Sequence, residues 1–132
     1  MTRPSRIDAA LEAARARLHR VAPDDLATEV ASGALVVDIR PEQDRQADGV
    51  LPGAIVIERN VLEWRLDPTS GHHLDDASPD RRVILVCNEG YASSLAAVAL
   101  VDLGVAGATD LAGGFRAWRR TRSDGTPTND GA

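Results

Sequence analysis

Short runs of apolar, often β-branched residues recur along the chain, and polar or glycine-containing segments separate them. Three runs, at residues 34–39, 54–57 and 83–86, have the length of a strand and are apolar except for Asp38. Strands without polar alternation are typical of parallel sheets that helices cover on both faces. Shorter strands are predicted at residues 18–21 and 109–111. The pattern therefore predicts a central, mostly parallel sheet of about five strands.

Segments with helical periodicity lie between these strands. Apolar residues recur every three or four positions over residues 5–17, which predicts an amphipathic helix. Pro23 and two acidic residues are expected to begin a second helix, which Gly33 ends. Further helices are expected at residues 42–48, 60–66, 93–103 and 114–120. The alternation predicts an α/β fold with helices on both faces of the sheet and right-handed crossovers.

The chain is expected to form one domain with two extensions. Its 132 residues, 43% of them hydrophobic and 27% charged, suit a single globular domain. The predicted units are an N-terminal helical arm at residues 1–17, the α/β domain at 18–121 and a flexible tail at 122–132. Residues 67–82 lack apolar periodicity and are expected to form a loop.

Composition removes several classes of function. A net charge of −5 gives no electrostatic basis for nucleic-acid binding. All fifteen basic residues are arginine, which excludes lysine Schiff-base chemistry, and a lone cysteine excludes an internal disulfide and a cysteine-rich zinc site. No apolar run has the length of a membrane span, and no secretory signal is visible, so a cytoplasmic location without membrane association is expected.

The aromatic and histidine residues are expected to be structural. Trp64 is predicted on the inner face of its helix, and Phe115 and Trp118 are predicted in the core. His72 and His73 are adjacent, without a spaced ligand set, and are assigned to a surface loop. No metal and no cofactor are therefore expected. The arginines of the last helix are expected to face water: Arg116, Arg119 and Arg120.

The single cysteine lies where a parallel sheet usually places its binding crevice. Cys87 directly follows the strand at residues 83–86, and a short loop then leads into the buried helix that begins at Ser93. Gly90 would allow the sharp turn of this loop, and Ser93 would cap the helix. Loop amides and a helix N-terminus form a hollow that favours anions. A thiol there is expected to be stabilised as a nucleophilic thiolate.

Four segments in order resemble the motifs of rhodanese-like domains: VDIR at residues 37–40, GVLPGA at 49–54, CNEGYAS at 87–93 and LAGGFRAW at 111–118. Val50 stands where the second motif usually has histidine. The cysteine motif alone is a weak signal, whereas the ordered set spans residues 21–118 and is specific. The chain is therefore similar to the rhodanese family, which implies a single rhodanese-like domain.

The resemblance also implies a ping-pong sulfur transfer. The Cys87 thiolate would take a sulfane sulfur from a small donor, such as thiosulfate or a persulfide, and hold it as a persulfide. The acceptor would be cyanide, a small thiol or a protein. The active loop would bind the anionic sulfur mainly through its N–H groups, and consists of Asn88, Glu89, Gly90, Tyr91, Ala92 and Ser93.

The loop departs from the family pattern in its charge. Many members carry a cation in it, whereas this chain has Glu89 and Ala92 and offers no side-chain charge to a dianion. Arg40 and Arg59 follow neighbouring strands at their carboxyl ends and are candidates for a supporting cation at the rim. Asp38 is expected to pair with Arg40. Separately, Tyr91 is expected to shape the entrance.

Two alternatives stay open. The first is a catalytically silent rhodanese-fold module for binding or redox sensing, in which Cys87 is oxidised or only structural. The second is a cysteine phosphatase or arsenate reductase, whose Cys-x5-Arg loop wraps an oxyanion. The sixth position after Cys87 is Ser93, which disfavours the second alternative. The sequence assigns neither the physiological donor and acceptor nor an oligomeric state.

Overall fold

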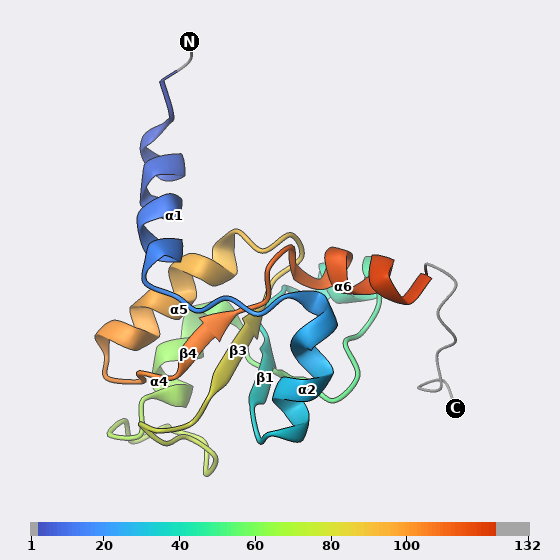
Figure 1. Ribbon diagram of the computed structural model, residues 1–132. Coiled ribbons are helices and arrows are strands. Elements are labelled where there is room, and N and C mark those ends of the chain that lie inside the picture. Colours follow the sequence, from blue (N-terminus) through green and yellow to red (C-terminus); the bar gives the residue numbers. More distant parts are fainter. Residues whose placement is uncertain (1–2, 124–132) are drawn as a thin grey trace.

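A parallel sheet of four strands lies at the centre of the computed structural model, which describes residues 3–123 (Figure 1). In the order β2-β1-β3-β4, every neighbouring pair is parallel. The strands are β1 (Leu35–Asp38), β2 (Ile55–Val56), β3 (Val83–Val86) and β4 (Ala108–Asp110). The predicted α/β class and parallel sheet are confirmed, with slightly fewer strands than the five expected.

The strand expected at residues 18–21 is reduced to one bridge beside β4. The Val21 N–H donates to the Asp110 carbonyl at 3.0 Å, and the Ala112 N–H donates to the Val21 carbonyl at 2.8 Å. Pro23 follows two residues later and begins a 3-10 turn. Because proline has no N–H and a fixed φ, the extended pairing ends there.

Strands β1 and β3 are buried on both faces because alternate side chains point into two separate cores, whereas Val56 of the edge strand β2 is 48% exposed. Val37 and Leu85 belong to one apolar cluster, and Val36 and Ile84 belong to the other. The first core contains apolar residues of helices α4 (Leu62–Leu66) and α5 (Ala92–Asp102). The second contains Leu26 of helix α2 (Leu26–Ala31), Leu111 and Phe115. The uninterrupted apolar runs in the sequence thus correspond to a sheet covered on both sides.

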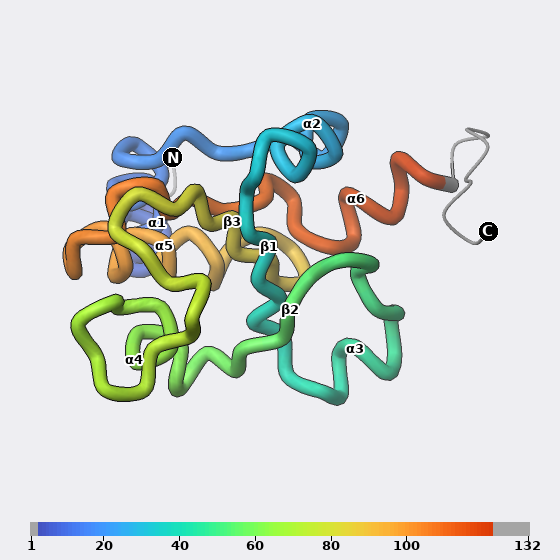
Figure 2. The backbone as a smooth tube through the Cα atoms, turned by 90° about the horizontal axis from the view of Figure 1, so that it is seen from below, coloured from blue at the N-terminus to red at the C-terminus, as the bar shows by residue number. Residues whose placement is uncertain are grey.

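Six α-helices surround the sheet in the described part of the chain, and Figure 2 shows α2 and α6 on one side and α4 and α5 on the other. They are α1 (Arg6–Ala16), α2 (Leu26–Ala31), α3 (Glu42–Asp48), α4 (Leu62–Leu66), α5 (Ala92–Asp102) and α6 (Gly114–Ser123). The 3-10 turns η1 (Pro23–Asp25) and η2 (Arg59–Val61) precede α2 and α4. Helix α6 includes the first two residues of the predicted tail, and residues 124–132 lie outside the described residues.

Helix α1 rests on α5 through its C-terminal half and projects from the domain at its N-terminal half (Figure 1). Ser5 caps it by accepting a hydrogen bond from the Asp8 N–H at 3.0 Å. Ala14 is buried, whereas Ile7, at the other end of the same apolar stripe, is 59% exposed. The predicted arm is therefore a helix of which only the second half is docked.

The prediction for Trp64 is wrong, because its side chain is 56% exposed. Leu62 and Leu66, four residues apart, form the buried face of α4. Trp64 lies midway between them and so points to the opposite side of the helix. Phe115 is buried as predicted, and Trp118 is partly buried against the same core.

Over residues 3–123, none of the helices combines the length and the apolar character needed to cross a membrane.

Candidate active site

The Cys87 sulfur lies at the carboxyl end of β3, where two backbone N–H groups point at it. The Gly90 N–H donates to Sγ at 3.1 Å, and the Ser93 N–H donates at 3.4 Å. The residue is 9% exposed, so the sulfur lies at the bottom of the loop. Such donors stabilise negative charge on sulfur, which is what a nucleophilic thiolate or a bound persulfide anion requires.

Backbone contacts with the first turn of α6 hold the active loop in place. The Phe115 N–H donates to the Cys87 carbonyl at 2.8 Å, and the Arg116 N–H donates to the Asn88 carbonyl at 3.0 Å. At Gly114 a Cβ atom would lie 2.5 Å from the Cys87 carbonyl oxygen. The last sequence motif thus packs directly on the cysteine loop, which explains why glycine is needed there.

Gly90 is the turning point of the loop. Its φ is +83°, in the left-handed region that favours glycine. A Cβ atom at this position would lie 2.7 Å from the Gly113 backbone nitrogen. Both facts agree with the sharp turn expected from the sequence.

The predicted role of Ser93 as a helix cap is wrong. Helix α5 begins at Ala92, its N-cap is Tyr91, and no side chain caps it. The Ser93 hydroxyl instead donates to Asp110 Oδ2 at 2.7 Å and lies 3.2 Å from the Cys87 sulfur, in position to accept from the thiol. The serine therefore connects the sulfur to a buried carboxylate rather than to a helix end.

The cysteine opens into a pocket of 360 Å³ at the carboxyl edge of the sheet. Its lining residues are Ile39, Arg40, Pro41, Asp44, Arg59, Cys87, Asn88, Glu89, Tyr91 and Ala92. Tyr91 is 62% exposed and stands at the mouth. Arg59 shares this pocket with the cysteine, and its guanidinium also pairs with Glu63 at 2.8 Å. Four of the six predicted loop residues and both rim arginines thus line one pocket, whereas Gly90 and Ser93 are not among its lining residues.

Asp38 and Arg40 form a buried ion pair behind the pocket. Arg40 Nη2 lies 2.8 Å from Asp38 Oδ2, and both side chains are almost fully excluded from water. The Arg40 guanidinium also donates to the Gly49 carbonyl at 2.8 Å and to Asn88 Oδ1 at 3.2 Å, and it lies 4.0 Å from the Phe115 ring centroid. The pair therefore ties the end of β1 to the active loop.

A second group of charges holds the outer side of the loop. Asn88 Nδ2 donates to Asp48 Oδ2 at 2.8 Å, and this hydrogen bond, with the nearby Arg116, keeps the pKa of Asp48 below its usual range. Arg116 also binds Glu89 Oε1 at 2.6 Å. The Arg116 side chain is 43% exposed, as expected for a residue that faces water, but the sequence did not predict that its charge pairs with Asp48 and with the loop carboxylate.

Sequence reasoning missed the groups beneath the loop. Asp110, fully buried, accepts hydrogen bonds from Ser93 and Ser94, both at 2.7 Å, and from Arg20 Nε at 2.8 Å. Arg15 Nη2 donates to the Gly90 carbonyl at 2.8 Å. The sequence contained one signal for Asp110, which is a polar residue at the end of a buried strand. It contained no signal that distinguishes Arg15 and Arg20 from the other arginines.

No metal-binding cluster accompanies these residues within the part of the chain that the structure describes. The adjacent histidines lie in an exposed loop, where His73 Nδ1 is 2.6 Å from the Ser70 carbonyl oxygen.

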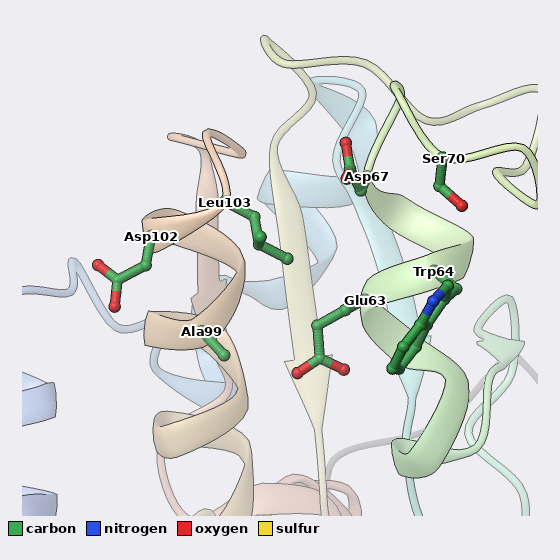
Figure 3. Close-up of a pocket in the computed structure, with 7 residues that line it drawn as sticks. All are labelled: Glu63, Trp64, Asp67, Ser70, Ala99, Asp102 and Leu103. Carbon is green, nitrogen blue, oxygen red and sulfur yellow. The ribbon is translucent and has the colours of Figure 1, made fainter.

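A different hollow, of 590 Å³, lies between α4 and the end of α5 and does not include Cys87 (Figure 3). Trp64 lies along it, together with three carboxylates that already have partners: Glu63 is bound by Arg59, Asp67 by Thr69 and Asp102 by Arg17. We assign no reactive group to this hollow.

Comparison with known proteins supports the resemblance seen in the motifs. The family model described as Rhodanese-like domain matches residues 22–121. Thiosulfate sulfurtransferase GlpE of Pseudomonas entomophila is 31% identical over 102 residues, which cover 77% of this chain and 85% of that protein. The human single-domain sulfurtransferase TSTD1 is similar in structure, with a TM-score of 0.66 and 26% identity over 76% of this chain and 95% of that one.

A third similar structure has a different description. It is a protein of unknown function from Rhodopseudomonas palustris CGA009, described as a possible tyrosine phosphatase. The TM-score is 0.80 at 30% identity, and the match covers 92% of this chain and 95% of that one.

Proposed function

Because the chain belongs to the rhodanese-like domain family, we propose that it is a sulfurtransferase in which Cys87 carries the sulfur. The curated and structural relatives named as sulfurtransferases support the rhodanese type of transferase. The observation that carries the proposal is the pair of backbone N–H groups directed at the Cys87 sulfur on the floor of an open pocket.

The proposed reaction has two displacements at sulfur. The Cys87 thiolate attacks the outer sulfur of the donor, a new S–S bond forms, and the donor's S–S bond breaks with its electron pair on the leaving group, which is sulfite when the donor is thiosulfate. The acceptor, cyanide or a thiolate, then attacks the terminal sulfur of the persulfide. The Cys87–S bond breaks, and the thiolate is restored. The N–H groups of Gly90 and Ser93 hold the negative charge on Cys87.

The test is direct because Cys87 is the only cysteine. After incubation with thiosulfate or an organic persulfide, the protein mass should rise by one sulfur atom, and the added mass should disappear on addition of cyanide. Protein alkylated beforehand at Cys87 serves as the control and should show no gain. An unchanged mass with all donors tested would refute sulfur carriage and favour the silent binding or redox-sensing module.

The charges around the pocket bear on the choice of donor. Glu89 is already bound by Arg116, and Arg40 is neutralised by Asp38. Arg59 is a cation on the rim, and its ion pair with Glu63 is partly exposed to water. We propose that Arg59 assists the binding of an anionic donor.

Substituting Arg59 with methionine is therefore expected to raise the KM for thiosulfate about three- to tenfold, with a smaller rise for a monoanionic thiosulfonate, because a lost cation weakens a dianion more. Steady-state kinetics with both donors measures this. Arg65→Met, on the neighbouring helix α4 and bound to the His72 carbonyl, is the matched control and should leave both KM values unchanged. Equal KM changes for the two donors would contradict the charge argument.

The phosphatase alternative has less support from this site. A cysteine phosphatase needs an arginine six positions after the cysteine to match the charge of the transition state, and this chain has Ser93 there. Arg15 and Arg20 lie near the loop, but both guanidinium groups bind the Gly90 carbonyl instead of lining the pocket.

A further inference from the structure

Two arginines from the N-terminal segment converge on the reverse side of the active loop. Arg15 Nη2 donates to the Gly90 carbonyl at 2.8 Å, and Arg20 Nη2 donates to the same oxygen at 2.9 Å. Arg15 lies on α1, and Arg20 lies in the connection before the Val21 bridge. Both precede residues 22–121, the region that matches the family model. The anchoring of this loop from outside that region is therefore a feature of this chain's own N-terminal segment.

The anchored carbonyl fixes the direction of a loop amide. In a trans peptide the C=O and the next N–H point in opposite directions, so the Tyr91 N–H points away from the two guanidinium groups. Glycine at position 90 lets this peptide plane rotate at little steric cost. A rotated plane would direct the Gly90 carbonyl oxygen toward an anionic sulfur. Two hydrogen bonds, from Arg15 and Arg20, oppose that rotation.

Arg20 also neutralises the buried carboxylate that lies next to the sulfur. Its guanidinium binds both oxygens of Asp110, at 2.8 and 3.2 Å, and so forms an ion pair with that carboxylate. Asp110 connects to the Cys87 sulfur through the Ser93 hydroxyl. Without Arg20, an unpaired buried negative charge would lie one hydroxyl group away from the sulfur and would oppose the thiolate.

From these contacts we propose that Arg20, assisted by Arg15, is a positioning residue for the Cys87 thiolate. It orients the Gly90 peptide and supplies the positive charge that offsets Asp110. The inference deepens the proposed function, since it concerns the same thiol. The other charged groups near the sulfur lie on the pocket side and stay unchanged in the test: Arg40, Arg59, Asp44 and Glu89.

The pH dependence of Cys87 alkylation tests this proposal without requiring any sulfur transfer. In Arg20→Met the midpoint of the alkylation profile is expected to move to higher pH by about one unit, a tenfold lower thiolate fraction near neutrality. Arg17→Met is the matched control on the same arm, because Arg17 forms an exposed ion pair with Asp102 away from the loop. Its profile should coincide with that of the unchanged protein.

A double variant separates the charge effect from lost packing. Replacing Arg20 with methionine and Asp110 with asparagine removes both charges, and the midpoint should return toward that of the unchanged protein. A merely structural Arg20 would lower the melting temperature and leave the midpoint in place, which would overturn the proposal. An equal shift in Arg17→Met would also overturn it.

Two milder variants decide the matter if Arg20→Met does not fold. Arg20→Lys keeps the charge, but a single ammonium does not reproduce the fork that serves Asp110 and Gly90 together, so a smaller upward shift is expected. Arg15→Met leaves the Arg20–Asp110 pair intact and removes one anchor of the Gly90 carbonyl, with the same expected direction. An unchanged midpoint in both would refute the inference.

Discussion

Substituting Cys87 with serine is expected to lower sulfur transfer at least about a thousandfold, to the uncatalysed background. A serine hydroxyl is not ionised at neutral pH and cannot carry a sulfane sulfur as a persulfide. No other thiol of the chain can take over this role, because Cys87 is its only cysteine. The formation of thiocyanate from thiosulfate and cyanide measures the loss.

The same variant should stay folded, which makes the result interpretable. An oxygen at this position can accept the hydrogen bonds that Gly90 and Ser93 now donate to sulfur. The urea unfolding midpoint should therefore change little. Turnover within tenfold of the unchanged protein would show that Cys87 does not carry the sulfur. If the unchanged protein itself has no turnover, yet is oxidised by mild peroxide, the redox-sensing alternative gains support.

Substituting Arg40 with methionine is expected to lower the free energy of unfolding by about 3–5 kcal/mol. The change leaves the Asp38 carboxylate buried without its cation, and it also removes hydrogen bonds to Gly49 and Asn88. Much of the cost comes from the charge that stays behind. Urea denaturation at neutral pH measures it.

The control for this prediction is an ion pair of the same chemistry with more exposure to water. Arg82 binds Glu29 through two hydrogen bonds of 3.1 Å, and both side chains are about one-third exposed. Arg82→Met should cost at most about 1 kcal/mol, because water screens the pair. A loss for Arg40→Met as small as that of the control would show that the buried pair contributes little to stability.

Uninterrupted apolar runs predicted the strands well, because a strand buried on both faces leaves little room for polar residues. The strand expected at residues 83–86 and the helix expected at 42–48 have these bounds in the structure. The parallel order then placed the ends of β1 and β3 at one edge, which brings Arg40 and Cys87 into one pocket. Local pattern and sheet topology were sufficient for these parts.

The error at Ser93 arose because a tertiary contact overrides local preference. Serine near a helix start is a good cap, but the Ser93 hydroxyl of α5 donates instead to Asp110 of β4. Trp64 is outside the core because the leucines two residues to either side occupy the buried face of α4. The Ser93 contact cannot be read from the neighbours in sequence, whereas the spacing of Leu62 and Leu66 was an available signal for Trp64.

The ion pairs around the active loop could not be predicted from the sequence. The loop contains the acidic residue Glu89 and no basic residue that could pair with it. In the structure, Arg116 reaches it from α6, 27 residues away, and Arg20 reaches the loop from 70 residues away. Long, flexible guanidinium side chains make such pairings invisible without the fold.

Arg15 and Arg20 precede residues 22–121, which match the family model, and they therefore affect where the chain can be truncated. A fragment limited to residues 22–121 would keep every recognisable motif and the whole parallel sheet, yet it would lose both guanidinium groups that hold the Gly90 carbonyl. If Arg20 positions the thiolate as proposed, the unit needed for sulfur transfer is longer than the unit that sequence similarity delimits. Transplanting or truncating this domain by its motifs alone would leave the buried Asp110 carboxylate without its counter-ion.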